Sequence, residues 1–386
     1  MSPSFFRLAA GVASLATAAV TLAQGSEKPV ADKAATTSQK ESSDDNSSWV
    51  GPGQPGSEIN GQFFHAQVLM SAQGFSPGVI DGKEGESFKL ALTSFQEAKG
   101  LRRTGKLDGP TRAALLQVNR PSTVTVRLGA DDVRSQYVYP FPKNPEQQAE
   151  LKFLGYRNML EKVAERYHTT PATIIALNGP DKMIGPGQEL RLPNVVPASH
   201  DYAGVGGNGA SAMNILNVDP QQPQGDYVVV DKSEGVLKVY RGQPPQGPEG
   251  EAKANTSASA TASAGQSGRA GQLVAAFPVT MGSKEFPLPI GRWKATTYAF
   301  LPPFNYQPQI LNHPKTDKEV KLPPGPNGPV GVAWLDLTKE HYGIHGTNEP
   351  QTIGRAESSG CIRMTNWDVL RLARMMKPGF TAIFQA

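Results

Sequence analysis

The stretch Ser358-Ser359-Gly360-Cys361-Ile362-Arg363 holds the only cysteine in a chain of 386 residues. A single cysteine cannot form an internal disulfide. In an exported protein it is a buried packing residue, an intermolecular partner or a nucleophile. Upstream lies His345, in Tyr342-Gly343-Ile344-His345-Gly346-Thr347. Because an imidazole can take a thiol proton, the two segments predict a cysteine nucleophile with a histidine base.

Glycines surround both residues and allow the backbone to come close to a substrate. The amide N–H groups of Gly360 and Cys361 can point at a developing oxyanion. The alternative for Cys361 is an inert packing thiol between Ile362 and Met364. Arg363 either binds a substrate carboxylate or braces its own loop.

The composition is that of a soluble globular protein, with 38% hydrophobic and 19% charged residues. The 40 glycines and 33 prolines predict many turns and several small domains. The net charge of +4 is mild and suits an anionic surface. No nucleic-acid motif and no cluster with metal-ligand spacing is present, so we expect no nucleic-acid partner, no metal and no cofactor.

The first 23 residues predict a signal peptide, because Arg7 precedes an apolar run over residues 8–22. An uncleaved membrane anchor is the alternative. No cysteine follows the run, which excludes a lipoprotein. Residues 24–58 are polar and predict a disordered linker. We therefore expect export across the inner membrane, to the periplasm or cell wall.

Residues 59–118 show apolar side chains at helical spacing and predict a three-helix module. Gly74-Phe75-Ser76-Pro77-Gly78, Ile80-Asp81-Gly82 and Thr104-Gly105-Lys106-Leu107-Asp108 place turn and capping residues between the helices. From residue 64 to 117 the string resembles the peptidoglycan-binding domain of cell-wall enzymes. The alternative is a helical spacer with no ligand.

Residues 149–196 predict a second small module, with helices around residues 160–167 and 170–178 and a strand near Leu190-Arg191-Leu192. The closing Ile184-Gly185-Pro186-Gly187-Gln188 turn resembles that of a LysM domain, a βααβ fold that binds glycans. Upstream, Gly155-Tyr156-Arg157-Asn158 replaces the usual Gly-Asp-Thr. This departure bears on whether the module binds glycans, and less on whether it adopts the fold.

Residues 197–224 predict another linker, so that the two modules would tether a catalytic domain without touching its active site. Residues 225–386 are rich in β-strand patterns, with a disordered insertion at 243–271 and a late helix near Trp367. The expected fold is multidomain, with a mostly-β sandwich or barrel at the C-terminal end.

The segments Ile344-His345-Gly346-Thr347 and Ser359-Gly360-Cys361-Ile362-Arg363 resemble the active-site signature of L,D-transpeptidases with a YkuD-type catalytic domain. The resemblance implies that Cys361 is the nucleophile and His345 its base. It further predicts oxyanion or orienting roles for Gly360, Gly346 and Ser359, and substrate contacts for Arg363, Thr347 and Tyr306. We expect a backbone carbonyl near Gly346 to orient the imidazole. Ser359 stands where family members commonly carry a second histidine.

The family implies a peptidoglycan L,D-transpeptidase that releases a terminal D-alanine from a tetrapeptide stem and joins the remainder to an amine. That amine belongs to a neighbouring stem or to a protein. Peptidoglycan is the expected partner, and the oligomeric state is unknown. The alternatives are an L,D-carboxypeptidase that uses water as acceptor, and a non-catalytic wall-binding protein.

Overall fold

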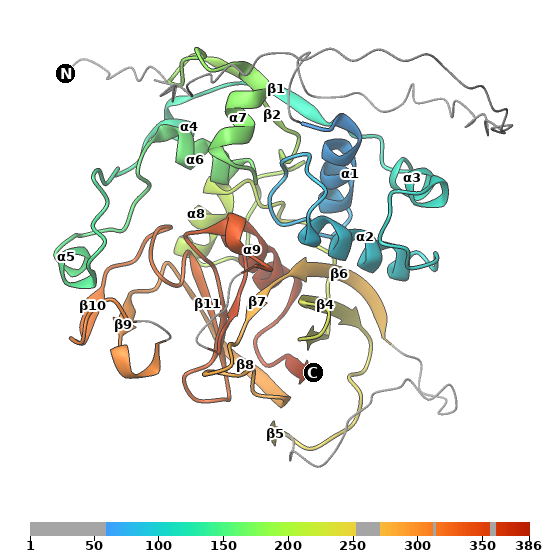
Figure 1. Cartoon of the computed structure of the whole chain (residues 1–386), viewed down its shortest axis with the longest axis vertical. Helices are drawn as coiled ribbons and strands as arrows, with labels where there is room; N and C mark the ends of the chain where they lie inside the picture. Colours follow the sequence, from blue (N-terminus) through green and yellow to red (C-terminus); the bar gives the residue numbers. More distant parts are fainter. Residues whose placement is uncertain (1–58, 252–270, 312–313, 356–359) are drawn as a thin grey trace, which may run out of the picture.

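The computed structural model describes residues 59–251, 271–311, 314–355 and 360–386 (Figure 1). The predictions of a signal peptide and of a linker over residues 24–58 lie outside this range, as do Ser359 and most of the predicted insertion. Two small modules lie above a large curved sheet, and helix α9 (Asn366–Met375) runs between them (Figure 1). Within the described residues, no helix has the length and apolarity needed to cross a membrane.

The first module, here the helical module, consists of α1 (Gly61–Ala72), α2 (Glu86–Ala98) and α3 (Gly109–Leu115). The Asn60 side chain caps α1 and the Asp108 side chain caps α3, where each accepts an otherwise unpaired backbone N–H. Apolar side chains from the three helices form a small core together with Val236, Leu273 and Ala276 of the C-terminal domain. The predicted three-helix module is confirmed.

The second module, here the βααβ module, is formed by β1 (Thr123–Arg127), α6 (Met159–Arg166), α7 (Pro171–Asn178) and β2 (Glu189–Pro193). β1 and β2 pair antiparallel over their whole lengths. The predicted lower boundary at residue 149 is therefore wrong for the fold, because the first strand lies further upstream. The short helices α4 (Ala130–Val133) and α5 (Pro145–Ala149) and irregular chain separate β1 from α6, which hides it from a local pattern search.

The C-terminal domain is built on a ten-stranded sheet in the order β6-β4-β3-β14-β8-β11-β12-β13-β7, with β5 paired to β8. β6 and β7 stand at opposite ends of this order although a single residue separates them in the chain. The sheet must therefore curve until its ends meet, as in a barrel. The strands are β3 (Tyr227–Asp231), β4 (Val236–Arg241), β5 (Gly250–Glu251), β6 (Gln272–Pro278), β7 (Thr280–Met281), β8 (Gly291–Phe300), β11 (Ala333–Leu337), β12 (Gly343–His345), β13 (Ile362–Arg363) and β14 (Thr381–Gln385).

A separate hairpin of β9 (Phe304–Tyr306) and β10 (Val320–Leu322) projects from this sheet domain. The hairpin packs against the segment around Leu154 that precedes α6. The predicted mostly-β catalytic domain is confirmed, including its late helix, α9.

The segment 197–224 is not a linker. It contains α8 (Gly207–Ile215), and Met213, Leu216 and Val218 are buried in the main core of the sheet domain. Most polar residues and glycines of this segment face outward, with Gly209 and Asn217 as buried exceptions, while a few apolar side chains reach the core. The average composition of the segment is polar, so it did not reveal these buried apolar residues.

The modules are also not loose tethers, because both contact α9. The Ser76 hydroxyl of the helical module donates to Asp368 at 2.7 Å, and Arg371 donates to the Ser71 carbonyl at 2.8 Å. From the βααβ module, Glu165 accepts a hydrogen bond from Asn366 at 2.6 Å. The expectation that the modules only tether the catalytic domain is wrong, because both pack against its helix α9.

Candidate active site

β12 and β13 lie side by side and bring the two predicted catalytic segments together. They pair in parallel, with Ile344 opposite Ile362 and His345 opposite Arg363. Both isoleucines are fully buried in the main core. Because side chains alternate along a strand, His345, Arg363 and the preceding Cys361 share the opposite face.

The His345 imidazole is held by its own backbone neighbour. Its Nδ1 lies 2.7 Å from the carbonyl oxygen of Gly346, so Nδ1 carries the proton and donates it. This is the carbonyl that the sequence led us to expect near Gly346. Burial, and secondly the charge of Arg363, lower the pKa of His345 to about 3. At neutral pH the ring is therefore uncharged, and its Nε2 has a lone pair that can accept a proton.

The indole of Trp334 fixes the plane of this ring. Trp334 is the register partner of His345 on β11, and the two rings stack with centroids 5.3 Å apart and planes at 16°. The Trp334 Nε1 donates to Asp336 at 3.0 Å, which holds the indole in turn. Stacking and the Gly346 carbonyl together leave the imidazole little freedom to rotate.

Cys361 is partly buried beside the hairpin that joins β11 to β12. Its Sγ lies 3.6 Å from the carbonyl oxygen of His341, a distance suited to a thiol donor. Burial raises the pKa of Cys361, and a backbone hydrogen bond from Gly343 and the charge of Arg363 oppose that rise. The resting pair is thus a thiol and a neutral imidazole.

The two glycines differ in what they can offer an oxyanion. Gly360 has a φ of +95°, and a Cβ there would collide with the Tyr342 ring, so this approach to Cys361 requires glycine. The Gly346 N–H already donates to the Ala333 carbonyl at 3.2 Å. Gly346 therefore orients the imidazole through its carbonyl, and its N–H is not available to an oxyanion.

Arg363 extends over the same face as Cys361 and His345. Its Nε is buried and has no hydrogen-bond partner among the described residues. Burial lowers the pKa of Arg363, and the charges of Cys361 and Glu349 act against that change. A buried, unpaired guanidinium nitrogen is costly, and a substrate carboxylate can satisfy it.

The other predicted substrate contacts are occupied within the protein. The Thr347 hydroxyl accepts the Glu349 N–H at 3.2 Å, and only 6% of Thr347 is exposed. Tyr306 is equally buried, packs with Leu154 and Leu322, and accepts the Lys315 N–H through its hydroxyl. The structure does not bring Tyr306 to the Cys361 face.

Sequence reasoning missed three residues that shape the site: Trp334, Tyr342 and Asn366. Tyr342 covers Gly360, and Asn366 packs against Gly346. The pattern on β11 could have shown that Trp334 and His345 pair. For Asn366 the sequence offered only its position soon after Arg363.

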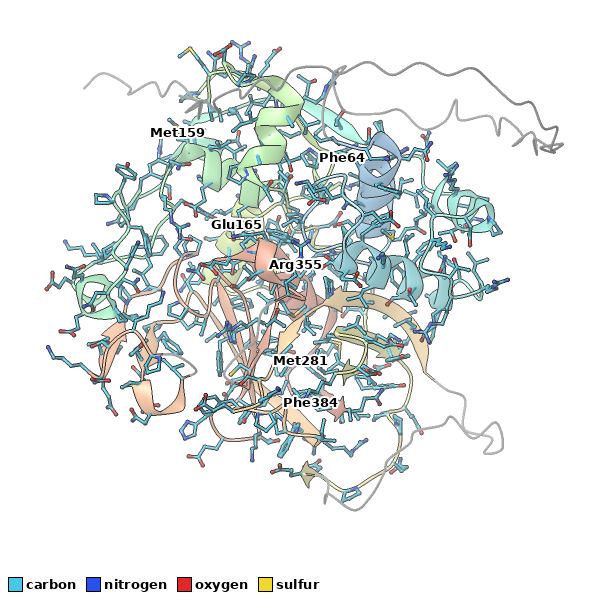
Figure 2. All side chains as sticks on the ribbon, viewed as in Figure 1. Phe64, Met159, Glu165, Met281, Arg355 and Phe384 are labelled. Atoms are coloured by element: carbon cyan, nitrogen blue, oxygen red, sulfur yellow. The ribbon has the colours of Figure 1, made fainter. Side chains whose placement is uncertain are left out.

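Two cavities flank the loop that follows His345. One has a volume of about 460 Å³ and lies between α6, the start of α7 and residues 348–351. The other, of about 480 Å³, is lined by α2, the β3–β4 turn, β7 and Gly354. Each module thus forms one wall of a hollow beside the loop. Glu165, which lines the first of these cavities, is labelled in Figure 2.

Comparison with known proteins gives two family matches. Residues 261–384 match the model described as "L,D-transpeptidase catalytic domain" (YkuD), and residues 64–115 match the "Putative peptidoglycan binding domain". The chain is 58% identical over 60 residues to the "Putative L,D-transpeptidase YkuD" of Bacillus licheniformis, which is 16% of this chain and 36% of that protein. It is 59% identical over 54 residues to the protein of that name from Bacillus subtilis, covering 14% and 33%.

The chain spans only about a third of the length of these curated relatives. Among solved structures, an L,D-transpeptidase from Xylanimonas cellulosilytica aligns at a TM-score of 0.32 and 13% identity, over 84% of this chain and 93% of that one. An L,D-transpeptidase from Mycobacterium smegmatis aligns at 0.28 and 17% identity, over 42% and 58%. Similarity of that size supports no statement about function. The two family matches show that this chain contains a peptidoglycan-binding domain followed by a catalytic domain of the YkuD-type L,D-transpeptidase family.

Proposed function

We propose that the protein is a peptidoglycan L,D-transpeptidase with Cys361 as nucleophile and His345 as general base. The observation that carries this proposal is the common face of β12 and β13, which the Nδ1-protonated, neutral imidazole of His345 shares with Cys361. The catalytic-family match covers both residues.

In the proposed reaction, the Cys361 sulfur attacks the carbonyl of the third residue of a tetrapeptide stem, and Nε2 of His345 takes the thiol proton. The tetrahedral intermediate collapses, the bond to the terminal D-alanine breaks, and His345 returns the proton to the leaving amine. An amine of a second stem then attacks the thioester. Its proton passes through His345 to the departing sulfur, which restores the thiol.

Arg363 is proposed to bind a carboxylate of the donor stem through its unpaired Nε. The oxyanion is assigned to the backbone N–H groups at Gly360 and Cys361, next to Ser359. The helical module, which matches a peptidoglycan-binding family, is proposed to hold the wall polymer. The βααβ module is a candidate glycan-binding LysM-like unit, and export to the cell wall follows from the substrate.

Incubation with a purified disaccharide-tetrapeptide, followed by mass spectrometry of the products, tests the proposal. A crosslinked dimer that lacks one D-alanine is expected. A disaccharide-tripeptide as the sole product would identify a hydrolase, and unchanged substrate would leave the wall-binding alternative. Cell fractionation with an antibody against the chain tests the location, and recovery in the cytoplasm would contradict it.

A further inference from the structure

Asn366 is one of the residues through which the βααβ module contacts the catalytic domain. It opens helix α9 and its side chain is 0% exposed. Its Nδ2 donates to Glu165 at 2.6 Å and to the Pro326 carbonyl at 3.2 Å, while its Oδ1 accepts the Val332 N–H at 3.1 Å. Both amide protons and the amide oxygen are therefore engaged.

The Asn366 oxygen also packs against the residue that orients the base. Gly346 has no room for a Cβ, because the Asn366 Oδ1 fills that space. The Gly346 carbonyl accepts the Nδ1–H of His345, and the Gly346 N–H pairs with Ala333. A change in the Asn366 side chain would therefore shift the backbone that holds the imidazole.

Glu165 is one of the groups that set the direction of the Asn366 amide. A carboxyl oxygen of Glu165 and the Pro326 carbonyl both accept hydrogen bonds, so together they select the NH₂ end of the amide and direct its oxygen toward Val332 and Gly346. Burial raises the pKa of Glu165 to about 7, and an oxygen of this side chain can accept the bond in either charge state. Glu165 belongs to α6, is 7% exposed, and also receives a hydrogen bond from the Tyr156 hydroxyl. Figure 2 shows Glu165 where the green βααβ module meets the sheet domain.

We propose that Glu165 and Asn366 are positioning residues for His345, so that the βααβ module fixes the orientation of the catalytic base. This inference rests on the role of His345 in the proposed function. It gives the module a task inside the catalytic domain, separate from any binding of wall polymer.

The test compares Glu165→Ala with Glu165→Gln in the full chain. Glu165→Ala removes the acceptor for Asn366, and we expect kcat to fall about tenfold while KM for the donor stays within about twofold, because the base is misplaced and the substrate is not. Glu165→Gln retains an oxygen that can accept the Nδ2–H, and is expected to recover most of the lost kcat.

Ser76→Ala is the matched control. It removes a buried hydrogen bond from the other module to Asp368, on the same helix and two residues from Asn366, without a route to Gly346. Its thermal stability should fall while kcat stays at the wild-type value. Should Glu165→Ala fail to fold, Glu165→Asp, which withdraws the carboxyl by one methylene, replaces it, with kcat expected below that of Glu165→Gln.

Nitrogen-15 NMR of the His345 ring separates this inference from the proposed function, because it needs no turnover. In the wild-type protein the signals should show Nδ1 protonated and Nε2 unprotonated, and Glu165→Ala should shift both toward a tautomer mixture. Unchanged signals and unchanged kcat in folded Glu165→Ala would overturn the inference. So would an equal loss of kcat in Ser76→Ala. A wild-type protein with the expected NMR signals but no activity on wall peptides would contradict the proposed function instead.

Discussion

The Nδ1–H of His345 donates to the carbonyl oxygen of Gly346, the next residue in the chain, at 2.7 Å. This bond selects one tautomer and leaves Nε2 as the basic nitrogen. Since no carboxylate is needed to select this tautomer, the site can work with the Cys361 and His345 side chains and the Gly346 carbonyl oxygen. The lowered pKa of His345 and the raised pKa of Cys361 both favour the uncharged resting pair.

The first prediction concerns the charge state of that pair. Iodoacetamide should alkylate Cys361 slowly at neutral pH, and the rate should rise steadily above pH 8, because only the thiolate reacts and burial raises the pKa of the thiol. The rate is read from the mass of the labelled peptide, with Cys361→Ser as the unlabelled control. A high rate that is constant from pH 5 to pH 8 would show a thiolate–imidazolium pair and contradict the assignment.

The second prediction concerns Arg363. Arg363→Gln should raise KM for a tetrapeptide donor roughly 10- to 100-fold, because a charge-assisted hydrogen bond to a substrate carboxylate is lost. Arg363→Lys should recover part of the affinity, as a point charge without the planar fork. Arg292→Gln is the control. The Arg292 Nε is likewise buried without a hydrogen-bond partner, but this side chain donates to the Pro245 carbonyl through Nη1 and lies outside the Cys361 face, so its loss should leave KM unchanged. An unaltered KM in Arg363→Gln would assign this arginine to bracing its own loop.

The third prediction concerns acid sensitivity. His168 stacks on Trp367 at 5.0 Å, its Nε2 donates to the Leu216 carbonyl at 2.7 Å, and burial lowers its pKa to about 3. The unfolded chain binds a proton near pH 6.5 and the folded chain does not, so stability is full above pH 6.5 and is lost as the pH falls toward 3. At pH 4 the loss from this residue is about 3 kcal/mol.

Denaturant unfolding between pH 8 and pH 4 measures this loss, and His168→Gln should show a shallower decline than the wild-type protein. The comparison uses the slopes, because the substitution also changes stability by an amount that does not depend on pH. Parallel curves for the two proteins would contradict the burial argument.

The fourth prediction concerns truncation. A chain that begins near Gly225 should not fold cooperatively, because it lacks α8 and the core side chains Met213, Leu216 and Val218, and it leaves Arg371 and Asn366 without their partners. A chain that begins at Ile59 should keep its activity on soluble muropeptides. Thermal melts and turnover of both proteins test this. A folded and fully active short chain would show instead that the two modules only tether the catalytic domain.

Much of the architecture could be predicted from local patterns. The caps at Asn60 and Asp108, the alternating strands of the C-terminal domain and the glycines around Cys361 each depend on near neighbours in the sequence. The placement of the His345 and Cys361 segments on neighbouring strands could also be predicted. The structure pairs His345 with Arg363, which puts Cys361 on the same face of the strand pair.

What could not be predicted depends on contacts between distant segments. The segment of β1 can be recognised as a strand only from its pairing with β2, some sixty residues later. The polar segment 197–224 contains α8, and its few apolar residues are buried only because the core of the sheet domain lies against them. The bond between Asn366 and Glu165 joins residues 201 positions apart, and no periodicity can report it.

The central claim is that Cys361 carries the acyl group, and the most direct measurement is the mass of the intact protein quenched in acid soon after mixing with a disaccharide-tetrapeptide. The account predicts an adduct equal to the donor minus its terminal D-alanine, located by digestion on the peptide that contains Cys361 and Arg363. Cys361→Ala should fold, bind isolated cell walls, and show neither adduct nor turnover. A carbapenem should likewise form an adduct at Cys361 in the folded wild-type protein. Turnover of the tetrapeptide by Cys361→Ala at the wild-type rate, or an acyl adduct on any other residue, would contradict the account.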